Sequence, residues 1–205
     1  MKLRKEEDMP DQTKLVHIYF LTGNRNKFNE ASSVLKDFGI KITMIDAKKI
    51  EVQHEDVKYI VKWIFNKGVN KIKRPTLIED SGLYIHCLNG FPGPYSSYVF
   101  KTLGVTGVLK LLENFENKKA EFRSALAFGD SRGLIGTVIG ITRGTISSYP
   151  RGNFGFGFDP IFIPENLEKT FGEMQLQDKN KYSHRAKALR KFVKLYKNNK
   201  KKYMA

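Results

Sequence analysis

A glycine, two asparagines and two cations follow directly on an apolar run. The run LVHIYFLT ends at Thr22, and GNRNK occupies residues 23–27. If a strand ends here and a helix begins, the first helix amides are unpaired and carry a partial positive charge, which favours a bound phosphate. Gly23 lets the backbone approach such an anion, and Lys27 adds a mobile cation. The segment matches neither GxxxxGK[ST] nor GxGxxG, so it predicts either a nucleotide site of another design or an ordinary turn.

Carboxylates near predicted strand ends are the second chemical feature. Glu79 and Asp80 follow the apolar segment 76–78, and Glu51 follows a second predicted strand. The carboxyl ends of parallel strands face the ligand crevice, where hard oxygen ligands hold Mg²⁺ (with Mn²⁺ as a substitute) against phosphates. A metal and a base are what phosphoanhydride hydrolysis needs. Acidic residues at strand ends are also common turn formers, so this pattern alone leaves both interpretations open.

Glycine and phenylalanine alternate in RGNFGFGFDPIF, residues 151–162. Glycine brings the backbone close to a flat ligand, and an aromatic face stacked on a nucleobase contributes about 1–3 kcal/mol in single-strand binders. We expect Phe156 to stack on a ligand. Phe154 and Phe158 are expected to pack in the core, as in a strand relieved by glycine.

The segment KNKYSHRAKAL, residues 179–189, predicts the start of the last helix. Ser183 has the residue type and position of an N-cap. Lys179, His184 and Arg185 then surround a helix start, which is again a favourable place for an anion.

The first half of the chain predicts alternating strands and helices. Residues 15–21 are apolar apart from His17, the pattern of a strand buried on both faces with His17 in the core. Apolar residues at helical spacing predict helices over 28–38, ending at Gly39, and from 57 to near Gly68. Alternation over 40–44 predicts the second strand, and 76–78 the third. This βαβαβ order indicates an α/β domain with a partly parallel sheet.

The second half predicts an antiparallel hairpin. Residues 120–128 alternate, DSRG follows at 130–133, and a β-rich run extends over 134–146. Helical stripes lie near 108–115 and 189–196. We therefore expect one α/β domain whose mixed sheet is flanked by helices.

Composition excludes several classes of protein. A chain of 205 residues buries enough surface to fold as a single domain, and one cysteine excludes a disulfide framework and a Cys-rich zinc site. The first twelve residues lack the apolar stretch of a secretory signal, and no run approaches the ~20 apolar residues of a membrane span. We expect a soluble cytoplasmic protein with no membrane partner.

The net charge of +15 is concentrated near the end of the chain. Residues 179–205 hold eleven Lys and Arg and no Asp or Glu, while the preceding 178 residues carry 25 basic and 21 acidic groups. Such a block is typical of a solvated face or tail, and less commonly of an anion site or a polyanion-binding arm.

Four separated motifs occur in an order typical of one family: TGNRNK at 22–27, EDSGL at 79–83 followed by GFPGPYS, FGFGFDPIF at 154–162, and SHRAKAL at 183–189. Over roughly residues 15–196 the chain resembles the inosine triphosphate pyrophosphatase family, also called the Ham1 family. The resemblance implies Mg²⁺-dependent cleavage of ITP, dITP and XTP to the monophosphate and pyrophosphate. It also implies an elongated mixed sheet with two lobes around a central nucleotide cleft, and a homodimer that needs no nucleic acid. Residues 1–13 and the basic tail 197–205 extend beyond the family pattern.

The same resemblance implies roles for individual residues. Asp80 corresponds to the general base and a metal ligand, Glu51 to a second metal ligand, and Lys27 to a catalytic cation. The triphosphate would be bound by Thr22, Gly23, Asn24, Arg25, Asn26, Lys27 and Lys62. The nucleoside would be bound by Ser81, Phe156, Gly157, Phe158, Asp159, Lys179, His184 and Arg185.

Two other functions remain open. A Maf-like nucleotide pyrophosphatase would favour pyrimidine or modified nucleotides, against which SHR and FGFDP argue. A nucleic-acid binder without enzyme activity is suggested by the basic C-terminus, although no RRM, KH or zinc module is present.

Overall fold

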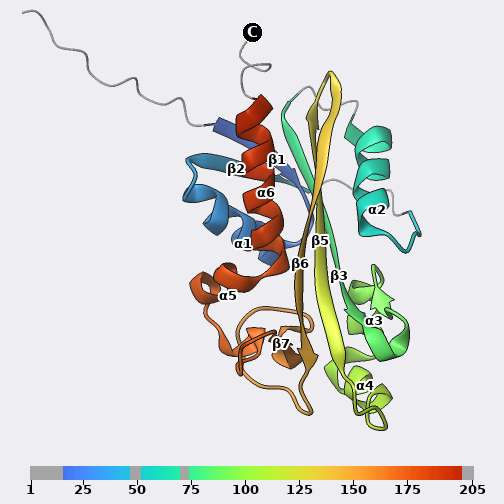
Figure 1. Ribbon diagram of the computed structural model, residues 1–205. Helices are drawn as coiled ribbons and strands as arrows, with labels where there is room; N and C mark the ends of the chain where they lie inside the picture. The colour runs from blue at the N-terminus through green and yellow to red at the C-terminus, as the bar shows by residue number, and fades with distance from the viewer. Residues whose placement is uncertain (1–15, 47–51, 70–73, 200–205) are drawn as a thin grey trace, which may run out of the picture.

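The computed structural model describes residues 16–46, 52–69 and 74–199 (Figure 1). The strands are β1 (Val16–Leu21), β2 (Ile40–Ile45), β3 (Thr76–Ile85), β4 (Pro92–Gly93), β5 (Lys119–Asp130), β6 (Gly133–Ile146) and β7 (Phe162–Pro164). The helices are α1 (Arg25–Lys36), α2 (Val57–Ile64), α3 (Ser96–Thr102), α4 (Gly104–Leu111), α5 (Leu176–Tyr182) and α6 (His184–Asn199). A π-helical turn, Phe65–Val69, extends α2.

One mixed sheet joins all seven strands in the order β2-β1-β3-β5-β6-β7, with β4 beside β3. The pairs β1–β2 and β1–β3 are parallel, and the others are antiparallel. The expected βαβαβ opening, the hairpin of β5 and β6, and the mixed sheet are therefore confirmed. Because α1 and α2 cover opposite faces of this sheet, a crevice opens at the carboxyl end of β1, where such sheets bind ligands.

Strand β3 is longer than its sequence suggests. The expectation that it ends before Glu79 is wrong, because β3 passes beyond the last residue of β1 and continues to Ile85, paired throughout with β5. The short strand β4 then pairs with its far end. A side-chain Cβ at Gly82 would lie 2.0 Å from the carbonyl oxygen of Gly93, so glycine is required for this approach. The part of β3 that lies between its pairing with β1 and its pairing with β4 borders the crevice.

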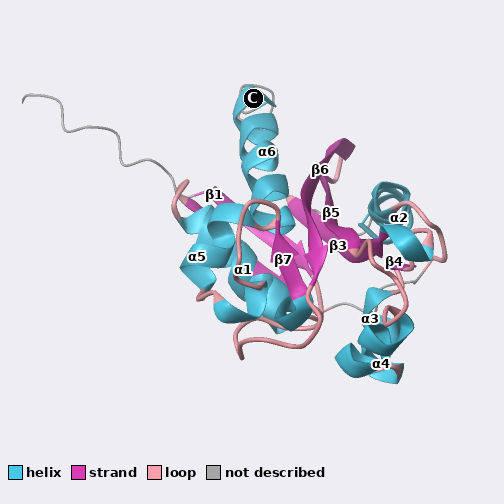
Figure 2. Cartoon of the chain, turned by 60° about the horizontal axis from the view of Figure 1, so that its bottom comes forward, coloured by secondary structure: helices cyan, strands magenta, loops and turns pink. Residues whose placement is uncertain are grey.

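The long strands β3, β5 and β6 connect two lobes (Figure 1). In the upper lobe of that view, α1 and α6 pack on one face of the sheet, and α2 packs on the other. In the lower lobe, a separate cluster includes Leu83, Val99, Phe158 and Phe171. Figure 2 shows α3 and α4 on the side of the sheet opposite α1 and α5. The elongated, two-lobed arrangement agrees with the expected fold class.

Two burial predictions are wrong. His17 is exposed and bonds Thr43 through Nε2 and Oγ1 at 2.7 Å, because only alternate residues of β1 face the cluster under α1 and α6. Phe154 is 50% exposed, whereas Phe158 is buried as expected. Among the described residues, every helix is too short or too polar to cross a bilayer.

Candidate active site

The loop between β1 and α1 is held by its own side chains. Asn24 caps α1, and its Oδ1 accepts from the amides of Asn26 at 2.9 Å and Lys27 at 3.1 Å. Thr22 Oγ1 accepts from the amide of Asn24 at 3.1 Å. Two of the first helix amides are therefore already capped by Asn24 and are not available to a ligand. Within the described residues, no hydrogen-bond acceptor is found for the amides of Gly23 and Arg25, so two amides of this turn are available to an anion.

Two adjoining cavities occupy the crevice between the lobes. The outer cavity, of about 910 Å³, lies against the β1–α1 loop, α2 and α3. The inner cavity, of about 310 Å³, is closed by the loop at 156–158 and by the start of α6. Both are lined by Asn24, Lys27, Asp80, Pro94, Ser97 and Lys101. The two cavities together therefore form one cleft with a polar, charged junction.

Adjacent carboxylates of β3 point to opposite faces of the sheet, since side chains alternate along a strand. Asp80 faces the cleft and lines both cavities, and it is the only carboxylate among the described residues that line them. Glu79 is fully buried on the α6 side, where it contacts Lys27, Arg185 and Ser124. The two residues therefore do not act as a carboxylate pair at a strand end.

A chain of buried ion pairs runs beneath the cleft. Lys27 Nζ lies 2.8 Å from Glu79 Oε2, and Arg185 Nε lies 3.1 Å from Glu79 Oε1. Arg185 also binds Glu30, whose other oxygen lies 2.5 Å from Lys179 Nζ. The chain ends at Asp159 Oδ2, 2.6 Å from Lys179 Nζ. These six groups carry three positive and three negative charges, and they connect the β1–α1 loop to the inner cavity.

Neighbouring charges decide how these buried carboxylates titrate. Burial alone would raise the pKa of Glu79, but Arg185 and Lys27 hold it well below its usual range. The pKa of Glu30 is likewise lowered by Arg185 and Lys179 against the effect of burial. Burial raises the pKa of Asp159, and Glu30 nearby adds to the rise. Glu79 and Glu30, which have two cationic partners each, therefore favour the ionised form, whereas Asp159 has only Lys179 as a cationic partner.

The inner cavity offers an aromatic surface and one buried polar atom. Phe156 is half-buried beside Lys179 and Arg185, and Asp159 Oδ2 accepts from its amide at 2.7 Å. His184 stacks on Phe122 with ring centroids 4.6 Å apart. His184 Nδ1 is buried, and the described residues supply no hydrogen-bond partner for it. A planar ligand with a polar edge fits this lining.

Loss of stability on acidification should follow from His184. Burial, then Arg185 and Lys179, lower its pKa well below the usual 6.5. The unfolded chain therefore binds more protons below pH 6.5, and stability falls there by up to about 1.4 kcal/mol per pH unit. Urea unfolding at pH 7.5 and 5.5 measures this loss, and His184→Gln should reduce the difference. An equal difference in both proteins would contradict the assignment.

Most residues proposed from the sequence meet in this cleft. The cavities are lined by Thr22, Gly23, Asn24, Asn26, Lys27, Asp80, Ser81, Phe156, Gly157, Phe158, Lys179, His184 and Arg185. Asp159 lies buried beneath the 156–158 loop and supports it. Arg25 is exposed and lines neither cavity, because the first residue of α1 points away from them. Glu51 lies outside the described residues.

Lys62 does not line the cleft either. Helix α2 presents Ile60 and Ile64 to the outer cavity. Lys62 lies two positions from each of them, on a different side of the helix, and is exposed. Its contact with phosphate therefore stays a prediction that the lining of the cleft does not support.

Sequence reasoning missed several lining residues and one supporting residue. Lys101 on α3 reaches both cavities, and His54 lines the outer one. The amide of Asp56 donates to His54 Nδ1 at 3.0 Å, which leaves the proton of a neutral ring on Nε2. Glu30 was detectable in principle, because it falls among the buried positions of α1 and a buried carboxylate needs cationic partners.

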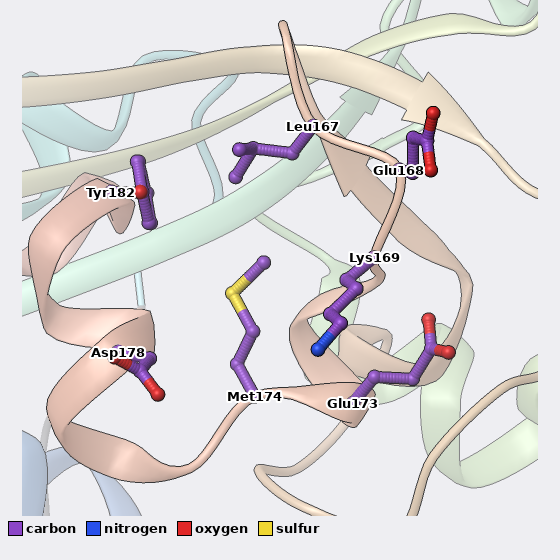
Figure 3. Close-up of a pocket in the computed structure, with 7 residues that line it drawn as sticks. All are labelled: Leu167, Glu168, Lys169, Glu173, Met174, Asp178 and Tyr182. Atoms are coloured by element: carbon purple, nitrogen blue, oxygen red, sulfur yellow. The ribbon is translucent and has the colours of Figure 1, made fainter.

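A third pocket, of about 210 Å³, lies between α5 and the loop after β7 (Figure 3). Its lining includes Glu168, Glu173 and Asp178. Glu173 already accepts from the amide of Thr170 at 2.8 Å, and Asp178 pairs with Lys181 at 2.7 Å. None of its lining residues lines the cleft, so we assign this pocket no part in the site.

Comparison with known proteins identifies the family. Residues 18–195 match the sequence profile of the Ham1 family, so the chain belongs to that family. It is similar to the dITP/XTP pyrophosphatase of Saccharolobus solfataricus, with 47% identity over 178 residues covering 87% of this chain and 92% of that protein. The corresponding protein of Methanopyrus kandleri is 46% identical over 182 residues, covering 89% and 97%.

Solved structures support the same relationship. The structure of a HAM1 protein from Coxiella burnetii matches with a TM-score of 0.70 and 27% identity, covering 89% of this chain and 99% of that one. The family match separates the chain from the Maf-like alternative.

Proposed function

We propose that this protein hydrolyses the non-standard purine nucleotides ITP, dITP and XTP to the monophosphate and pyrophosphate, and so cleanses the nucleotide pool. The observation that carries the proposal is the junction of the two cavities, where Asp80, Lys27 and Lys101 line one cleft. The base would occupy the inner cavity and the β and γ phosphates the outer one. Relatives named dITP/XTP pyrophosphatase support this substrate class.

The inner cavity favours a purine with an oxygen at position 6. Lys179 has three donors, two of which contact carboxylates, so one remains for a ligand acceptor. Arg185 lies in the same wall of the cavity and carries further N–H donors. An amino group at position 6 would face donors and leave polar groups unpaired, at about 1–3 kcal/mol each. Phe156 would supply the stacking surface.

The donors at the junction suit Mg²⁺. Asp80, Ser97 and Gln53 line the outer cavity and carry side-chain oxygen atoms, and Mg²⁺ commonly binds one or two carboxylates together with substrate phosphates. Among the described residues, no group of three His, Cys, Asp or Glu forms a protein-only metal cage. Asp80 would hold the ion, with Glu51 as a proposed second ligand. When bound, Mg²⁺ neutralises charge on the phosphate oxygens.

The chain's own residues account for the hydrolytic step. Asp80 accepts a proton from the water that attacks the α phosphorus, and the bond from that phosphorus to the bridging oxygen of pyrophosphate breaks. Lys27, held by Glu79 through one of its three donors, keeps two donors for the departing phosphates. Lys101 approaches them from the opposite lobe. These groups stabilise charge that develops on the leaving group.

A panel of nucleotides tests the proposal directly. Release of pyrophosphate from ITP, XTP, GTP, ATP, dTTP and UTP would be measured with and without Mg²⁺. We expect turnover of ITP and XTP that requires the metal. Preference for dTTP or UTP would instead favour a Maf-like activity, and background rates for every nucleotide would refute the enzyme proposal.

Lys101→Ala should reduce kcat/KM for ITP by about tenfold or more, because a hydrogen bond to a charged group contributes about 1.5–3 kcal/mol. Lys101 is exposed in the free protein, so its loss should leave stability unchanged. Steady-state pyrophosphate release measures the effect. Lys110→Ala removes the same charge from an exposed site on α4 and should behave as wild type. Equal kinetics for both variants would exclude Lys101 from the site.

Family membership also supports a homodimer, which we propose together with a cytoplasmic location. Light scattering during size exclusion would give twice the mass of the 23.6 kDa chain. A monomeric mass at assay concentrations would contradict the dimer.

A further inference from the structure

The outward face of α6 is a continuous basic surface. Its exposed residues are Lys187, Lys191, Lys194, Lys197 and Asn198. Lys187, Lys191 and Lys194 are spaced i, i+4 and i+7, so they form one stripe. The half-buried Arg190 adds a further cation beside it. We call Lys187, Arg190, Lys191, Lys194 and Lys197 the α6 basic face; Figure 1 shows α6 on the outside of the sheet.

Among the described residues, the α6 basic face forms no close ion pair, and Glu165 acts on Lys187 only at longer range. Elsewhere on the surface, Arg132 pairs with Asp130 and Lys181 with Asp178. Within the described part of the chain, none of the five cations of the α6 basic face has a carboxylate within 4.0 Å. Like charges at i, i+3 and i+4 destabilise a helix. A bound polyanion would relieve this repulsion.

Hydrogen bonds within the protein account for only some of the lysines of the α6 basic face. The ammonium groups of Lys187 and Lys191 donate to the carbonyls of Ile141 at 3.2 Å and Ile139 at 2.8 Å, on the edge of β6. Such lysines protect an edge strand from pairing with another chain. Each keeps two further donors and its full charge. Lys194 makes no such contact among the described residues.

We propose that the α6 basic face binds the phosphate backbone of duplex nucleic acid without sequence preference. From Lys187 to Lys197 the helix rises about 15 Å, which matches about four phosphates of one strand at 3.4 Å each. The exposed positions of α6 include no aromatic residue for stacking on unpaired bases and no apolar residue for insertion into a bilayer.

Binding of the full-length protein to a fluorescent 20-base-pair DNA duplex tests the proposal. Three to four phosphate contacts predict that affinity falls about 40- to 150-fold between 50 and 200 mM salt. The variant with Lys187→Gln, Lys191→Gln and Lys194→Gln should bind at least about tenfold more weakly and with a shallower salt dependence. Its nucleotide turnover serves as the test of folding, and Lys194→Gln alone should show a smaller loss of the same kind.

A matched control variant distinguishes binding by the α6 basic face from an effect of the protein's net charge. Lys58→Gln, Lys110→Gln and Lys119→Gln remove three exposed cations from other surfaces, so the net charge changes equally. This control should retain duplex binding. Equal weakening by both triple variants, absence of duplex binding at 50 mM salt, or tighter binding to phosphatidylserine vesicles or poly-glutamate would overturn the proposal.

Discussion

Asp80→Asn is expected to lower the turnover of ITP by about 10²- to 10⁴-fold, the usual contribution of a positioned general base. Asparagine keeps the volume of the side chain but cannot take the proton of the attacking water. No other carboxylate among the described residues lines the cleft, so no neighbour is placed to replace it. Loss of a metal ligand would act in the same direction. Pyrophosphate release under saturating ITP and Mg²⁺ measures the change.

The control for Asp80→Asn is the same substitution in a surface turn. Asp130 lies at the β5–β6 hairpin and pairs with Arg132, outside the cavities. Asp130→Asn should therefore retain turnover. Thermal unfolding of Asp80→Asn should remain cooperative, since Asp80 lines the cleft rather than a packed core and asparagine keeps its volume. A folded Asp80→Asn protein with near-normal turnover would exclude Asp80 as the base.

Local patterns predict the elements that pack by a regular period. The hairpin of β5 and β6 follows from alternation, and α1 and α6 follow from apolar stripes that face the sheet. The end of β3 could not be located in this way. Glu79 looks like a turn residue, yet it is buried within a strand because Arg185 and Lys27, distant in sequence, neutralise it. Such compensation depends on tertiary contacts that local propensity does not contain.

The residues of the site also divide into those that sequence motifs predict and those whose position follows only from tertiary packing. The separated motifs predict Lys27, Asp80, Phe156 and His184, which line the cleft. Lys101 lies on α3, where Tyr98 and Phe100 are exposed, so no buried apolar stripe indicates the helix or its orientation. Motif order identifies which segments converge, but the side of a helix that faces the cleft follows from packing. Lys62, which the resemblance assigns to the site but which lines neither cavity, illustrates the difference.

The ion-pair chain beneath the cleft explains how distant segments are held together. Arg185 on α6 binds Glu30 of α1 and Glu79 of β3, and its Nη2 donates to Ser81 Oγ at 3.0 Å. A Cβ at Gly140 would lie 2.1 Å from the carbonyl of His184, so this glycine lets α6 begin directly against β6. The start of α6 is thereby fixed by backbone contact on one side and by charge on the other.

Arg185→Met should destabilise the protein by about 3–5 kcal/mol, because removing one partner leaves a buried carboxylate uncompensated. For a chain of this size, that loss lowers the melting temperature by roughly 6–20 °C. Arg190→Met provides the matched control in the same helix, since Arg190 is half-buried and bonds one carbonyl, that of Asn180, at 2.8 Å. We expect it to cost less than about 1 kcal/mol, as for most surface substitutions. Urea unfolding at pH 7.5 measures both.

A second substitution distinguishes lost charge balance from lost packing. In Arg185→Met with Glu30→Gln, the remaining buried groups Lys27, Glu79, Lys179 and Asp159 again sum to zero charge. The double variant should therefore be more stable than Arg185→Met alone, although Glu30→Gln by itself leaves a cation unpaired and destabilises. If the two losses were instead additive, as for independent sites, the ion pairs would not act as one chain. The stability of this fold would then rest on the volume of the Arg185 side chain rather than on its charge.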